Sequence, residues 1–72
     1  MRSVDQTMTY RVVVDAKGWT VIRDGRDDPI WRTAEKQDAL EYGRQVAVSN
    51  QPARLLVYAD DGTVESECLF GL

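Results

Sequence analysis

The strongest constraint on the fold is the alternation of apolar and polar residues in four short segments, which occur as two pairs. The first pair spans residues 8–15 and 19–23, and the second spans residues 54–59 and 63–70. β-Branched and aromatic residues are frequent in these segments, as is typical of strands. A short connection containing glycine separates the members of each pair, and glycine adopts the positive φ that tight turns require. The pattern predicts two β-hairpins.

A single helix is predicted between the hairpins, over residues 33–49, because apolar residues recur there at helical spacing and form one stripe. Thr33 is expected to cap the start of the helix, and Asn50 to end it in a left-handed conformation. Gly43 costs about 1 kcal/mol of helix propensity relative to alanine, so we expect it to allow a close approach to the sheet. The stripe consists of Ala39, Leu40, Gly43, Val46 and Ala47.

These elements predict an α+β domain of order ββαββ, in which two β-hairpins form an antiparallel sheet and one helix packs on one face. A chain of 72 residues leaves no room for a second core. We expect residues 8–72 to form this single domain and residues 1–7 to form a flexible N-terminal tail. Residues 24–32 are expected to form an irregular polar loop, because Gly25 and Pro29 interrupt regular structure.

Cysteine and histidine usage limits the possible chemistry, since the chain has one cysteine, Cys68, and no histidine. We expect no metal and no other cofactor, because no spacing resembles a zinc site. Nucleophilic catalysis most often needs histidine as the base, and Cys68 alternates with apolar residues as a core thiol would. The acidic pairs at 27–28 and 60–61 are explained by a solvated loop and a turn. We therefore expect no enzyme activity; an enzyme acting through loop carboxylates is the least favoured alternative.

Charge and hydropathy bear on partners and location. The net charge is −3, with nine basic and twelve acidic residues interspersed, so no basic stripe suited to nucleic acid is evident. No apolar run resembles a signal peptide or reaches the roughly 20 residues that span a bilayer. An unpaired cysteine suits a reducing compartment, and we expect a cytoplasmic protein without membrane contact.

Apolar residues are predicted on both faces of the sheet, although one helix covers only one face. A contiguous apolar patch usually marks an interaction site, whereas residues scattered among polar neighbours are ordinary surface residues. If the strands over 8–15 and 54–59 are adjacent, these residues cluster and favour a homodimer. The alternative is that the exposed edge of the strand over 63–70 pairs with its copy. The interface candidates on the uncovered face are Val13, Ile22, Leu56, Tyr58 and Leu69.

Trp31 is a further interface candidate, because it lies beside arginines in the predicted loop and this composition is enriched in binding hot spots. The other interpretation is that Trp31 covers the core where the chain crosses to the helix. The sequence thus predicts a non-enzymatic protein-interaction module that binds a second copy or another protein. The alternative is a small regulatory protein that contacts nucleic acid through Arg23, Arg26, Arg32, Arg44 and Arg54.

The order of motifs resembles a family of small bacterial and archaeal proteins catalogued only as a domain of unknown function. Those proteins share a strand, a Gly-Trp strand, a Thr-capped helix, a strand, an Asp-Gly turn and a strand. The resemblance covers about residues 9–70 and implies a fold but no activity, so it assigns no functional residue. Many members carry a basic helix and tail, whereas this chain is acidic. The residues that carry the resemblance are 10–14, Gly18-Trp19-Thr20-Val21, Thr33, Asp38-Ala39-Leu40, Leu56-Val57-Tyr58 and Asp61-Gly62-Thr63-Val64.

Overall fold

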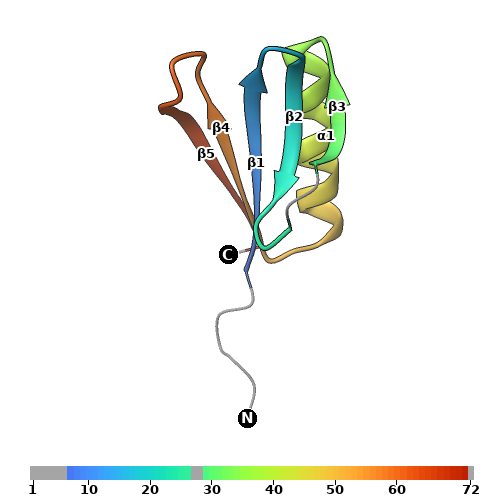
Figure 1. Cartoon of the computed structure of the whole chain (residues 1–72). Helices are drawn as coiled ribbons and strands as arrows, with labels where there is room; N and C mark the ends of the chain where they lie inside the picture. The colour runs from blue at the N-terminus through green and yellow to red at the C-terminus, as the bar shows by residue number, and fades with distance from the viewer. Residues whose placement is uncertain (1–6, 27–28, 72) are drawn as a thin grey trace.

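The computed structural model describes residues 7–26 and 29–71 and has one helix packed on one face of a five-stranded sheet (Figure 1). The predicted α+β class is therefore confirmed. Residues 1–6 of the predicted tail lie outside the described residues. Within the described ranges, no helix is long and apolar enough to cross a membrane. The elements are β1 (Met8–Asp15), β2 (Gly18–Arg23), β3 (Pro29–Thr33), α1 (Lys36–Ser49), β4 (Ala53–Tyr58) and β5 (Val64–Phe70).

The third strand, β3, corrects the prediction of an irregular loop over residues 24–32, and the element order is βββαββ, not ββαββ. β3 pairs antiparallel with β2, with Trp31 opposite Val21 and a register shift beyond that pair. Pro29 has no N–H to donate, which is tolerated at the first position of an edge strand. The side chain of Ile30 packs against the core. β3 was not predicted because it begins with a proline and because the register shift disturbs the alternation of apolar and polar residues.

The strand order is β3-β2-β1-β4-β5, and the central pair, β1 and β4, is parallel. The prediction of a wholly antiparallel sheet is therefore wrong. β1, β2 and β3 form a meander, so β3 runs in the direction of β1 (Figure 1). α1 then returns across the sheet, and β4 begins at the end where β1 begins. The two predicted hairpins, β1–β2 and β4–β5, are both present.

The core lies between α1 and the sheet, where α1 packs against β1, β2, β3 and β4 and leaves β5 largely uncovered. Gly43 faces this interface, as predicted. A Cβ atom on Gly43 would lie 3.1 Å from Leu55 Cδ1 and 3.3 Å from Val12 Cγ2, so glycine permits the close helix–sheet contact. The buried apolar residues are Tyr10, Val12, Val21, Ala39, Ala47, Ala53, Leu55 and Val57.

Of the two predicted helix caps, Asn50 is the observed C-cap of α1, whereas Thr33 is not the N-cap. Thr33 is the last residue of β3, and Glu35 is the N-cap, without a side-chain capping hydrogen bond. The Thr33 hydroxyl accepts a hydrogen bond from the Glu35 N–H at 3.3 Å. Asn50 has φ −126°, so it is not left-handed. Instead its N–H donates to the Ala47 carbonyl, and its side-chain amide donates to the Val46 carbonyl at 2.8 Å.

Candidate functional site

The sheet face opposite α1, here called the open face, carries five of the six predicted interface residues. Strand alternation places Val13, Ile22, Leu56 and Tyr58 there as half-buried side chains. Leu69 of β5 lies on the same face and is 57% exposed. β1 and β4 are adjacent, which was the condition for these residues to cluster.

Arg11 separates the apolar residues on the open face. It lies opposite Ile22 on β2 and opposite Leu56 on β4, so a cation stands between these two apolar side chains. Its Nε is 2.6 Å from Asp24 Oδ1, and its Nη1 donates a hydrogen bond to the Tyr58 hydroxyl. The open face is therefore a mosaic in which an arginine network interrupts the apolar surface.

Three arginine–carboxylate ion pairs lie on the open face, and in each pair one positive charge is balanced by one negative charge. Arg32 Nη1 is 3.2 Å from Asp15 Oδ2, beside Thr20. Thr20 is only 3% exposed, and its hydroxyl has no hydrogen-bond partner among the described residues. The third pair joins β4 to β5: Arg54 Nε is 3.0 Å from Glu67 Oε2, without the alignment of a hydrogen bond.

Hydrogen bonds lower the pKa values of two of these carboxylates, Asp15 and Asp24. The Arg11 guanidinium holds the pKa of Asp24 below its ordinary value, and Asp24 in turn raises the pKa of Arg11. The pKa of Asp15 is lowered first by the Lys17 backbone N–H and then by Arg32. These shifts stabilise the charged forms, as ion pairing in a structural role does.

β5 is the edge strand that α1 leaves uncovered, and it contributes the most exposed apolar side chains of the sheet. A register shift in its pairing with β4 brings Val64 opposite Tyr58, on the open face, where Val64 is 53% exposed. Glu65 Oε1 accepts a hydrogen bond from Lys36 Nζ of α1 at 2.8 Å. Cys68 is half-buried and packs against the core, in agreement with the predicted structural thiol.

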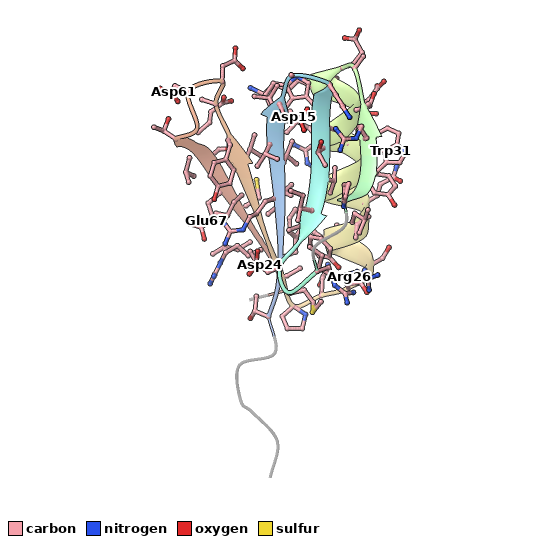
Figure 2. All side chains as sticks on the ribbon, viewed as in Figure 1. Asp15, Asp24, Arg26, Trp31, Asp61 and Glu67 are labelled. Carbon is pink, nitrogen blue, oxygen red and sulfur yellow. The ribbon has the colours of Figure 1, made fainter. Side chains whose placement is uncertain are left out.

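Trp31, the sixth predicted interface residue, lies on the helix side of the sheet and not on the open face. It stands opposite Val21 in β3, and its ring stacks on Tyr42 of α1 with the ring centroids 4.7 Å apart. Trp31 is 37% exposed at the outer edge of the domain (Figure 2). Tyr42 was not among the residues predicted from the sequence. It could have been recognised as an aromatic residue on the face of the helix that packs against an edge strand.

Asp61, one of the acidic residues considered for catalysis, has a structural role in its turn. Asp61 Oδ1 accepts hydrogen bonds from the Thr63 N–H at 3.0 Å and the Thr63 hydroxyl at 2.7 Å, which is the predicted turn role. The pair at 27–28 lies outside the described residues. Across residues 7–26 and 29–71, no three Cys, Asp or Glu side chains lie together in a group suited to a metal ion.

Comparison with known proteins agrees with the resemblance inferred from the motifs. Neither the curated proteins nor the solved structures include a significant match to the chain. A family model described as "Uncharacterized protein conserved in bacteria (DUF2188)" matches residues 10–68, which span all but the ends of the β1–β5 sheet. The chain therefore belongs to DUF2188, a family of uncharacterized proteins conserved in bacteria.

Proposed function

We propose that this chain is a non-enzymatic protein-interaction module of the cytoplasm that pairs with a second copy of itself along the edge of β5. One observation carries this proposal: β5 is a seven-residue edge strand whose two carboxylates are both neutralised by cations of the same chain. The lone cysteine, Cys68, is half-buried and unpaired, which suits a reducing compartment.

The two edges of the sheet differ in how well they resist pairing. Natural edge strands are protected by shortness, proline, bulges or charge. β3 has five residues, begins with Pro29 and has an irregular register with β2. β5 has seven residues and no proline, and Val64 and Leu69 are more than half exposed. The pairing of β5 with β4 has a register shift at the Val64 end, so over the rest of the strand the remaining protection of β5 is its charge.

Ion pairs within the chain compensate that charge. Glu65 is held by Lys36, and Glu67 is held by Arg54. Two antiparallel copies of β5 bring the same acidic strand against itself, and like charges across a strand pair are destabilising unless neutralised. Pairing β5 with β5 around a two-fold axis also closes at two copies, whereas head-to-tail pairing of β5 with β3 of another copy gives larger rings or open filaments.

The other candidates have weaker support. On the open face, Arg11 stands between Ile22 and Leu56, so a copy docking there meets a mosaic and not a continuous apolar patch. For nucleic acid, a basic stripe is the expected footprint. Of the arginines considered, Arg32 and Arg54 are held by carboxylates, which compensates their charge.

Sedimentation equilibrium over a range of protein concentrations tests the proposal, together with the variant Arg54→Gln. This variant leaves Glu67 unpaired on β5, so we expect a dimer that dissociates more readily and regains affinity at high salt. Arg11→Gln is the matched control: it removes an arginine ion pair of the open face away from β5, and we expect unchanged dimerisation. A monomer at all concentrations, or a larger effect from Arg11→Gln than from Arg54→Gln, contradicts pairing through β5.

A further inference from the structure

The stacked rings of Trp31 and Tyr42 form a surface that the proposed β5 pairing does not use. Their planes are inclined by 22°, with the centroids 4.7 Å apart. Trp31 belongs to the edge strand β3, at the end of the sheet opposite β5. Trp31 is 37% exposed and stacks on Tyr42, which packs against the core. Trp31 therefore covers the edge of the core through Tyr42 and still leaves aromatic surface exposed.

A hollow of about 180 Å³ adjoins this aromatic pair. Two of its lining residues, Asp38 and Glu41, are exposed carboxylates of α1, and Gln45 follows one turn later. Positions three, four and seven residues apart share one helix face, so these side chains project beside Tyr42. The five lining residues are Trp31, Asp38, Glu41, Tyr42 and Gln45.

Two carboxylates give the hollow its negative charge. Neither Asp38 nor Glu41 forms an ion pair with any residue that the structure describes. Arg44, three residues after Glu41, lines a larger neighbouring depression of α1 that shares Glu41 and Gln45 with the hollow, and it forms no ion pair with Glu41. The hollow thus combines two negative charges with an exposed aromatic surface, which is complementary to an organic cation.

We propose that the hollow beside Trp31 and Tyr42 binds an arginine side chain of a partner protein. The planar guanidinium stacks on aromatic rings and donates several hydrogen bonds to carboxylates, and arginine suits such a site better than lysine does. The volume is below the roughly 300–1,000 Å³ of sites for drug-sized ligands, so the hollow accommodates a side-chain head group. Exposed tryptophan with charged neighbours is also typical of interface anchors.

This inference is independent of the proposed self-association, because β3 and β5 are the two opposite edges of the sheet. Pairing through β5 leaves both hollows of a dimer free at the outer ends of the joined sheet. The monomer and the dimer are therefore expected to bind the cation equally, and a failure of one proposal does not decide the other.

The test is an NMR titration of the full chain with the blocked tripeptide acetyl-Gly-Arg-Gly-amide. The matched probe contains citrulline, which keeps the planar shape and removes the charge. The indole N–H resonance of Trp31 reports on the site and is assigned by its loss in Trp31→Phe. We expect a saturable shift with the arginine peptide, weaker at high salt, and at least about tenfold weaker binding of the citrulline peptide.

Two sets of variants separate binding from folding. Asp38→Asn with Glu41→Gln removes both charges from exposed positions, and we expect about tenfold weaker binding. The unfolding temperature is expected to fall only slightly, because Asp38 lies in the first turn of α1 and its charge favours the helix dipole. Asp60→Asn is the control, because Asp60 is exposed in the β4–β5 turn and lies outside the hollow. The absence of a saturable shift, equal binding of both peptides, or equal effects of the double variant and Asp60→Asn overturns the proposal.

Discussion

The hydroxyl of Tyr58 on β4 accepts a hydrogen bond from the guanidinium of Arg11 on β1, across the only parallel pair among the described strands. The same guanidinium bonds to Asp24, just beyond the end of β2. One side chain thereby connects three consecutive regions of the open face. Its role is structural: it joins the first hairpin to the second at the centre of the sheet.

We expect Arg11→Gln and Tyr58→Phe each to lower the free energy of unfolding by about 0.5–1.5 kcal/mol, because partly exposed hydrogen bonds and ion pairs contribute this much. Chemical denaturation of the two single variants and the double variant measures their coupling. We expect the double variant to lose less than the sum of the single losses. Arg26→Gln is the control, since Arg26 is exposed and forms no ion pair with the described residues. Additive losses contradict the contact.

Stability is expected to fall in acid through the carboxylates that accept hydrogen bonds. The pKa of Asp24 is lowered in the folded chain, chiefly by Arg11. A carboxyl with a depressed pKa stabilises the fold above its unfolded pKa of about 4, and this contribution disappears as pH falls through the lower, folded value. Thermal unfolding between neutral and acidic pH should show a shallower decline for Asp24→Asn than for the natural chain. An equal decline in both contradicts this role of Asp24.

Gly18, which opens β2, is expected to be intolerant of substitution. Its φ is +127°, and a Cβ there would lie 2.7 Å from the Thr33 carbonyl oxygen of β3. Gly25 also has a positive φ, +90°, but a Cβ would meet no atom within 4 Å. We expect Gly18→Ala to destabilise the fold by more than Gly25→Ala, which carries about 1 kcal/mol of backbone strain alone. Equal losses in chemical denaturation contradict the predicted clash with β3.

Gly43 tests the close approach of α1 to β1 and β4. A leucine there would overfill the space against Leu55 and Val12, and overpacking costs typically 1–3 kcal/mol. Gly43→Ala gains up to about 1 kcal/mol of helix propensity, which its single Cβ offsets by crowding Leu55 and Val12. We therefore expect Gly43→Leu to be markedly less stable than Gly43→Ala, as measured by denaturant unfolding. Similar stabilities contradict the tight helix–sheet contact.

Local patterns were sufficient to predict much of the fold. Strand alternation placed Val13, Ile22 and Leu56 on the face opposite the helix, because a period of two depends on no distant contact. The Asp-Gly turn and Gly18 could likewise be predicted locally, because each turn requires a glycine with positive φ. These features together account for the hairpins, the helix and the half-buried residues of the open face.

Most of the incorrect predictions follow from not recognising β3 as a strand. Pro29 and Gly25 indicate breaks, and the irregular register of β3 disturbs its alternation. Omitting one strand reverses the expected direction of the later helix and strands. The parallel pairing of β1 with β4 could therefore not be predicted. The same omission left Trp31 in a loop, away from Tyr42. The pair formed by Arg11 and Asp24 depends on register between strands, which the sequence alone leaves open.

The central claim is the pairing of β5 with β5 of a second copy, and hydrogen exchange of the β5 amides as a function of protein concentration tests it most directly. Two variants accompany the natural chain, both on the open face: Leu69→Lys adds a charge to the edge strand β5, and Leu56→Lys adds one to the inner strand β4. We expect slower exchange along residues 64–70 as concentration rises, in the natural chain and in Leu56→Lys but not in Leu69→Lys. Exchange independent of concentration, or protection lost only in Leu56→Lys, would contradict the account.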